Sequence, residues 1–144
     1  MVEDLGIRIS AFFAFGACLT SAILMLAFPM FGAYWGYGIY VYIVAGAGDQ
    51  GSLIIVAAVF MILCSLMALA TIAVPERLKK MYMIPGVILP FIVFILGLAG
   101  LGMAYDGFSG KEWWPETGFF GSVIPSLIAA LVFLGIYIMM RRRE

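Results

Sequence analysis

The stretch Glu76-Arg77-Leu78-Lys79-Lys80 decides the fold, because it is the only cluster of charged residues between the two ends of the chain. Two long apolar regions precede it and two more follow it. A charged cluster between apolar regions is typical of a short loop between membrane-spanning segments. The sequence therefore predicts two hydrophobic hairpins joined by a short basic loop.

The composition supports this interpretation. Of the 144 residues, 65% are hydrophobic and only 11% are charged, and the mean hydropathy is +1.15. In soluble domains about a quarter of the residues are charged. We therefore expect an integral membrane protein whose first partner is the lipid bilayer. The formal net charge is zero, which argues against nucleic acid as a partner.

Four charge-free runs are long enough to cross a bilayer, which takes roughly 20 residues of helix. The first ends at Pro29 and the second at Pro75, where proline cannot continue a helix. Inside the third, Pro90 removes one helical hydrogen bond and predicts a kink. We expect one domain, an all-α bundle of four transmembrane helices, with spans at about residues 9–29, 53–74, 83–105 and 119–140.

The stretch from Phe31 to Gly48 also lacks charge but has a different composition. Glycine lowers helix propensity, and the run Ile39-Tyr40-Val41-Tyr42-Ile43-Val44 favours an extended chain. We interpret the stretch as an aromatic, glycine-rich first outer loop that can hold a short β-strand or hairpin. A fifth, glycine-rich span is the alternative, because its length is sufficient.

The basic residues predict the orientation. In a four-span scheme only Lys111 lies on the side of the two longer loops, and seven basic residues lie on the other. By the positive-inside rule the basic side is cytoplasmic. We therefore expect both termini in the cytoplasm and the protein in the plasma membrane. The topology rests on Arg8, Arg77, Lys79, Lys80, Arg141, Arg142 and Arg143.

Residues capable of chemistry are scarce. Histidine is absent, and none of the predicted spans contains Asp, Glu, Lys or Arg. Proton relays and ion-coupled transporters usually need such a group within the membrane. Small multidrug transporters also have four short helices, but they depend on a membrane-embedded glutamate that is missing here. We predict no catalytic, cofactor-binding or metal-binding residue and no enzyme activity, and we interpret Cys18 and Cys64 as buried packing residues.

Small residues recur at every third or fourth position in three of the spans. Such stripes let helices approach closely, either within one bundle or between chains, and the sequence does not separate these two uses. The candidate helix-packing residues are Ala14, Cys18, Ala22, Gly97, Gly100, Ala104, Ser122, Ser126 and Ala130.

Tyrosine and tryptophan gather in the two outer loops. Both residue types are enriched at membrane interfaces and at protein interfaces. We therefore select these aromatic residues as a candidate interaction surface: Tyr34, Trp35, Tyr37, Tyr40, Tyr42, Trp113 and Trp114.

A long aromatic first outer loop, a short basic inner loop and a smaller second outer loop together resemble the layout of claudins and related tetraspan proteins. The claudin signature of Trp, Gly-Leu-Trp and paired cysteines is replaced here by Trp35-Gly36-Tyr37-Gly38. The tetraspanin Cys-Cys-Gly motif is also missing. The resemblance is therefore one of topology.

These observations lead to one functional expectation and two alternatives. We expect a non-catalytic accessory or structural subunit of a larger membrane protein assembly, with other membrane subunits or copies of itself as partners. The first alternative is an oligomeric channel or passive transporter of small solutes. The second is a claudin-like envelope or cell-contact protein that acts through its outer loops.

Overall fold

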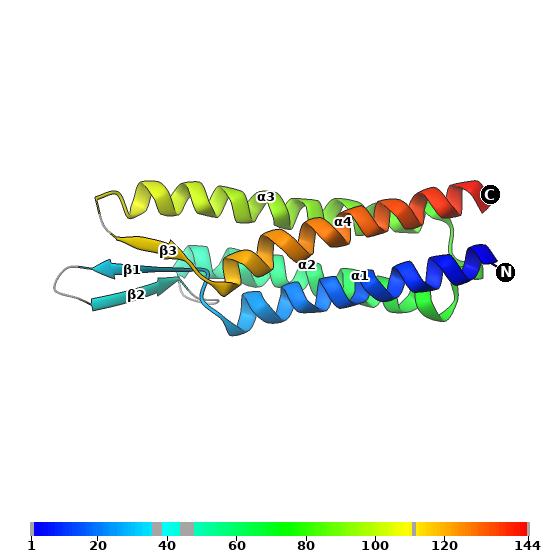
Figure 1. The fold of residues 1–144 in the computed structure, drawn as a ribbon, viewed down its shortest axis with the longest axis horizontal. Coiled ribbons are helices and arrows are strands. Elements are labelled where there is room, and N and C mark those ends of the chain that lie inside the picture. Colours follow the sequence, from blue (N-terminus) through cyan, green and yellow to red (C-terminus); the bar gives the residue numbers. More distant parts are fainter. Residues whose placement is uncertain (1, 36–38, 44–47, 111, 144) are drawn as a thin grey trace.

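The computed structural model describes residues 2–35, 39–43, 48–110 and 112–143. Four long helices run side by side along the molecule: α1 (Val2–Ala27), α2 (Gly48–Ala73), α3 (Ile84–Gly107) and α4 (Thr117–Arg143) (Figure 1). All four are long and apolar enough to cross a membrane. The predicted bundle of four such helices is thereby confirmed.

The two ends of the bundle differ (Figure 1). Both termini lie at one end, together with two short 3₁₀ helices, η1 (Pro75–Arg77) and η2 (Lys80–Met83), which we call the terminal end. The opposite end carries three strands, β1 (Phe31–Trp35), β2 (Ile39–Ile43) and β3 (Trp113–Pro115), and is the sheet end. The chain thus forms two helical hairpins, with the charged loop at residues 76–80 joining them.

The first outer segment forms strands in its described part. β1 pairs with β2 in an antiparallel hairpin, with Phe31 opposite Ile43 and Trp35 opposite Ile39. The predicted hairpin is confirmed, and the alternative of a fifth span is wrong for these residues, because both segments are extended. The sheet also contains a strand that the sequence did not predict. β3 pairs with the other edge of β1, giving the order β2-β1-β3.

The helices extend beyond the predicted spans, and α2 already begins at Gly48 rather than near residue 53. α1 begins at Val2 rather than near residue 9, and α4 continues to Arg143 rather than ending near residue 140. The extensions of α1 and α4 carry charged residues that pair with each other at the terminal end, so these helices need not stop where the charges begin. α3 runs unbroken through Pro90, whose predicted kink stays a prediction, and α4 contains a further internal proline, Pro125.

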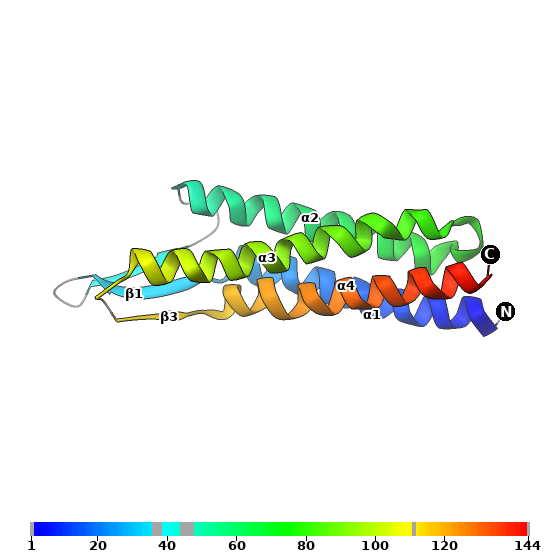
Figure 2. The ribbon, with the colours of Figure 1, turned by 90° about the horizontal axis from the view of Figure 1, so that it is seen from above.

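The helices do not contact one another equally. α1 packs along both α2 and α4, and α4 packs along α3, whereas α2 and α3 share a much smaller contact. Seen from above, the beginning of α2 stands away from α3 at the sheet end (Figure 2). The bundle therefore has three extensive helix contacts, α1–α2, α1–α4 and α3–α4, and one limited contact, α2–α3.

Close packing in the bundle depends on small residues. An added Cβ at Gly86 would lie 2.6 Å from the Phe133 ring, and one at Gly97 would lie 2.7 Å from Ser122 Oγ. A Cβ added at Gly121 would likewise overlap the Leu24 side chain, so α4 also meets α1 through a glycine. Helix contacts built on small residues replace hydrophobic burial as the main stabilising factor inside a membrane.

The buried hydroxyl groups all donate to backbone carbonyls. Ser21 bridges two helices by donating to Gly121 O at 2.7 Å. Four others donate within their own helix: Ser65 to Ile62 O, Thr71 to Met67 O, Ser122 to Phe119 O and Ser126 to Ser122 O. No buried side-chain nitrogen or oxygen in the described part of the chain lacks a hydrogen-bond partner.

Candidate functional site

The sheet joins the two outer segments of the chain into one unit. β1 lies in the middle and receives β3 in register, with Gly32 opposite Trp114 and Ala33 opposite Trp113. Three further backbone hydrogen bonds extend this pairing: Tyr34 N to Glu112 O at 2.9 Å, Glu116 N to Met30 O at 2.9 Å and Gly118 N to Pro29 O at 3.0 Å. The start of α4 is therefore fixed against the end of α1.

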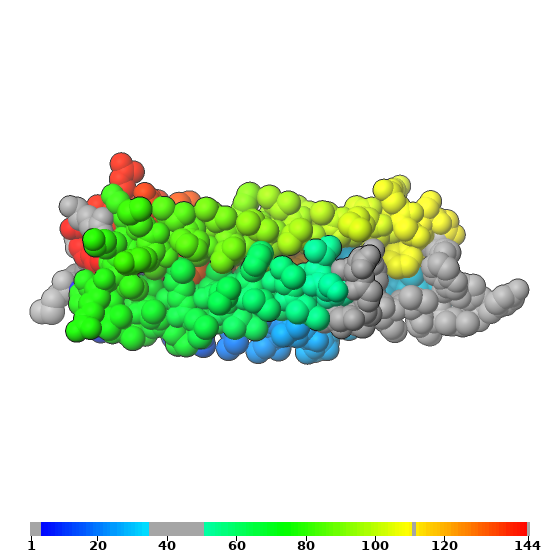
Figure 3. Space-filling model, turned by 180° about the vertical axis from the view of Figure 1, so that it is seen from behind, coloured from blue at the N-terminus to red at the C-terminus, as the bar shows by residue number. Residues whose placement is uncertain are grey.

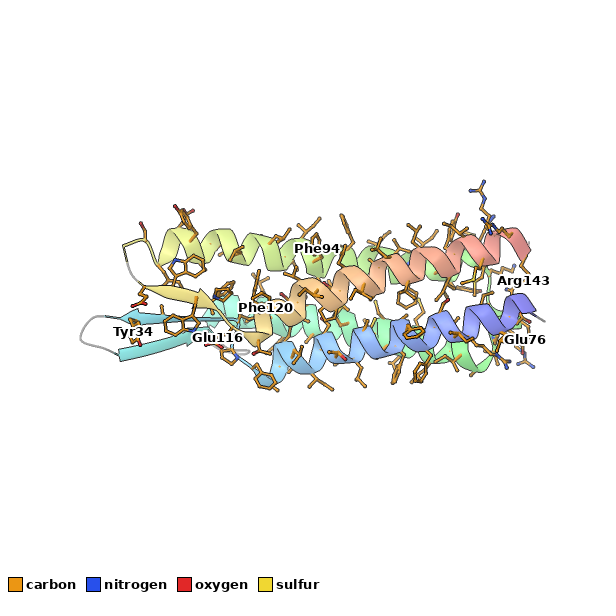
Figure 4. All side chains as sticks on the ribbon, in the orientation of Figure 1. Tyr34, Glu76, Phe94, Glu116, Phe120 and Arg143 are labelled. Carbon is orange, nitrogen blue, oxygen red and sulfur yellow. The ribbon has the colours of Figure 1, made fainter. Side chains whose placement is uncertain are left out.

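Trp114 lies on one face of the sheet, directly over Gly32. A Cβ added at Gly32 would come within 2.8 Å of the indole nitrogen, so only glycine leaves room for this ring. The Tyr34 ring meets Trp114 edge-on at a centroid distance of 5.3 Å. The indole N–H donates to Glu116 Oε1 at 2.5 Å, which fixes the orientation of the ring. Figure 4 labels Tyr34 and Glu116 at this end of the bundle.

Trp113 faces the other side, as adjacent residues of a strand do. Its ring centroid lies 6.2 Å from that of Phe31 and 6.3 Å from that of Phe108 at the end of α3. Phe31 in turn packs on Phe119 of α4 at 5.3 Å. Trp113 and Phe31 thus attach the sheet to the two helices of the second hairpin.

The structure brings two of the seven predicted interface residues together. Tyr34 and Trp114 are partly exposed and pack against each other on one face of the sheet, whereas Trp113, also partly exposed, packs on the other face against Phe31 and Phe108. The backbone of Trp35, Tyr40 and Tyr42 lies in the strands, but their side chains are outside the described part of the chain, as is all of Tyr37. Sequence reasoning missed Gly32, Phe31 and Glu116, whose roles depend on a pairing with β3 that has no local signal.

The charges at the two ends have opposite sign in the described part of the chain. The sheet end has the carboxylates of Asp106, Glu112 and Glu116. The terminal end holds the seven predicted topology residues; Arg8, Arg77, Lys79, Arg141 and Arg142 are exposed, and Lys80 and Arg143 are partly buried. Arg8 pairs with Glu76 at 3.8 Å.

The candidate helix-packing residues lie inside the bundle with one partial exception. Ala14, Cys18, Ala22, Gly97, Ala104, Ser122, Ser126 and Ala130 are buried, and Gly100 is partly exposed. Cys18 of α1 and Cys64 of α2 are both buried free cysteines. No group of three histidine, cysteine or acidic side chains that could hold a metal ion occurs among the described residues.

A pocket that the sequence did not predict lies between α2 and α3 near the sheet end. Its volume is about 100 Å³. Figure 3 looks onto the face formed by these two helices. The lining is apolar except for Ser122 and includes Phe31 of β1 as well as residues of all four helices. We call it the α2–α3 pocket.

Comparison with known proteins gives no further guide to this site. No family model matches the chain, and neither a curated protein nor a solved structure does.

Proposed function

We propose that this protein is a non-catalytic accessory or structural subunit of a larger membrane protein assembly, and that the sheet is the surface by which it contacts its partner. The observation that carries the proposal is the construction of the sheet. It joins both outer segments, extends beyond α1, α2 and α4 and presents partly exposed aromatic rings held in fixed orientations.

Rigidity supports a role in recognition. Tyr34 and Trp114 are held by ring contact, by the strand pairing and by the bond from Trp114 to Glu116. A surface that is already ordered loses little conformational freedom when it binds. Large aromatic rings held in this way are typical anchors of protein interfaces.

The interior of the bundle supports a passive role. The spans carry no charged residue between Ile9 and Ala27, Gly51 and Ala73, Ile84 and Tyr105, or Thr117 and Met140. The buried hydroxyls donate to backbone carbonyls. Ion-coupled transport and proton relay usually depend on intramembrane ionisable groups, so the helices are better suited to holding the sheet in place.

The charges support a particular chemistry of the partner surface and a particular orientation in the membrane. Asp106, Glu112 and Glu116 make the sheet end acidic, which favours a partner surface with basic and aromatic side chains. The basic terminal end is the cytoplasmic one by the positive-inside rule. The sheet then faces the outside of the plasma membrane.

The test is gentle solubilisation of a tagged chain from its native membrane, followed by identification of what is purified with it. We expect a stoichiometric membrane partner or a second copy of the chain. The Glu112→Lys variant changes an exposed charge beside β3 and should reduce this recovery. Lys79→Glu makes a charge change of the same size at the terminal end and serves as the matched control.

Two outcomes would contradict the proposal. One is a chain that leaves the native membrane as a lone monomer. The other is solute flux through liposomes containing the purified protein alone, which would favour the oligomeric channel instead. Equal recovery with both variants would leave the subunit role in place but would exclude the sheet as the contact surface.

A further inference from the structure

The α2–α3 pocket is present because two helices that neighbour each other in the bundle make only a limited contact. Ala57 on α2 and Gly97 and Gly100 on α3 leave space between the two backbones. Ile54, Val93 and Phe31 also line this space. The space is about 100 Å³.

The pocket opens sideways between the helices. Leu53, Ala99 and Met103 line it and are also exposed on the outside of the bundle, whereas Val93 and Gly97 line it and are buried. These five residues belong to the two apolar helices that span Gly51–Ala73 and Lys80–Gly107. The opening therefore faces the hydrocarbon of the bilayer, in the half nearest the sheet.

The lining does not favour a polar occupant. Ser122 is the one polar residue in it, and its hydroxyl already donates to Phe119 O at 2.7 Å. Apolar cavities of this order stay free of water and accept apolar molecules, as an engineered cavity of about 150 Å³ does with benzene. The size suits part of a linear chain rather than a fused-ring sterol or a lipid head group.

We propose that the α2–α3 pocket is a binding site for one fatty acyl chain of a phospholipid from the leaflet on the side of the sheet. The chain enters between Ala99 and Leu53 and ends against Phe31. Its affinity comes from close packing on several sides, because the surrounding lipid is as apolar as the pocket. Since Phe31 also packs on Trp113 and Phe119, the bound chain supports the base of the sheet.

The experiment measures lipid retained by the purified full chain in detergent. The probe is dioleoyl phosphatidylcholine, and native mass spectrometry counts the molecules bound to each protein. Gly100→Leu places a side chain in the pocket and should reduce retention roughly tenfold. Gly102→Leu is the matched control, because a Cβ at Gly102 meets nothing within 4 Å and the residue is not part of the lining.

Ala99→Phe provides a second variant, because Ala99 is exposed at the mouth of the pocket and tolerates a larger side chain without repacking the interior. It should reduce retention as Gly100→Leu does, and it decides the test if Gly100→Leu does not fold. Dioleoyl phosphatidylglycerol, with the same chains and another head group, should be retained equally by the unaltered protein.

The proposal fails if all four proteins retain the same amount of lipid, or if retention follows the head group rather than the chain. It also fails if a photoreactive side chain at residue 99 in the native membrane crosslinks to a protein segment and not to lipid. None of these results depends on whether the sheet binds a partner, so this test and that of the proposed function can fail independently.

Discussion

Arg143 Nη1 lies 3.0 Å from Asp4 Oδ1, so the last residue described in α4 is paired with the first turns of α1. The same guanidinium donates to Pro75 O at 3.0 Å and to Leu78 O at 2.8 Å. One side chain thus joins both ends of the chain to the loop between the two hairpins (Figure 4). The planar fork of arginine makes several such bonds at once, which the ammonium group of lysine does less well.

Replacing Arg143 should loosen the terminal end. We expect Arg143→Ala to lower the free energy of unfolding by about 1–3 kcal/mol, because two carbonyls and a carboxylate lose a charged donor in a partly buried position. Arg143→Lys should recover only part of this loss. Arg142→Ala, at an exposed residue, is the control and should change the free energy of unfolding by less than about 0.5 kcal/mol. Thermal unfolding in detergent measures both variants. Equal effects of the two alanine variants would contradict the role of Arg143 in joining the helix ends to the loop.

The contact of α3 with α4 predicts a contrast between two glycines. A Cβ at Gly97 would lie 2.7 Å from Ser122 Oγ and 2.9 Å from Val123 Cγ2, whereas one at Gly102 meets nothing within 4 Å. We expect Gly97→Ala to destabilise the fold by about 1–3 kcal/mol through overpacking. Gly102→Ala should be neutral or stabilise by up to about 1 kcal/mol through helix propensity. Thermal unfolding of the two variants measures this difference in the free energy of unfolding. A Gly97→Ala protein as stable as the unaltered one would show that α3 and α4 do not meet here.

Gly32 should control the position of Trp114. In Gly32→Ala the new Cβ would lie 2.8–3.0 Å from three indole atoms, so the ring must move and its bond to Glu116 must weaken. We expect the near-ultraviolet circular dichroism of this variant to shift towards that of Trp114→Phe. Gly107→Ala is the control, because its Cβ meets nothing within 4 Å; an unchanged spectrum of Gly32→Ala would exclude the pairing of β1 with β3.

The two ends of the bundle should lie on opposite sides of the membrane. Ser109 and Lys79 are both exposed and lie at the sheet end and the terminal end. In a background of Cys18→Ala and Cys64→Ala, we expect a membrane-impermeant maleimide to label Ser109→Cys on intact cells. Lys79→Cys should label only after the membrane is opened, and labelling of both from one side would overturn the proposed topology.

Sequence patterns predicted those parts of the fold that local composition controls. The charge-free runs gave the four long helices, and the β-branched and aromatic residues of Ile39–Ile43 gave the hairpin. The predicted first span begins near residue 9, after the charges of Asp4 and Arg8, whereas α1 already begins at Val2 and includes both residues. Their partners, Arg143 and Glu76, are distant in sequence, and no local pattern shows that a charge has a partner.

The candidate site was predictable only in part for the same reason. Tyr34, Trp113 and Trp114 could be selected by residue type, but the contact of Tyr34 with Trp114 and the position of Trp113 on the opposite face depend on β3. This strand has three residues and includes a proline. A strand this short has no alternation to recognise. The α2–α3 pocket depends on the distance between two helices. Small residues allow helices to approach closely, but they do not determine this distance.

The order of the strands also determines when the sheet can be completed during synthesis. β1 and β2 can form their hairpin as soon as the first outer segment has emerged, because they are adjacent in the chain. β3 pairs with β1 but comes after α2 and α3, so both of these helices must be synthesised before it arrives. Until then one edge of β1 lacks its partner strand. A chain whose synthesis stalls after the helical hairpin of α1 and α2 therefore exposes this edge of β1. The exposed edge could let quality-control machinery distinguish an unfinished protein from a complete one.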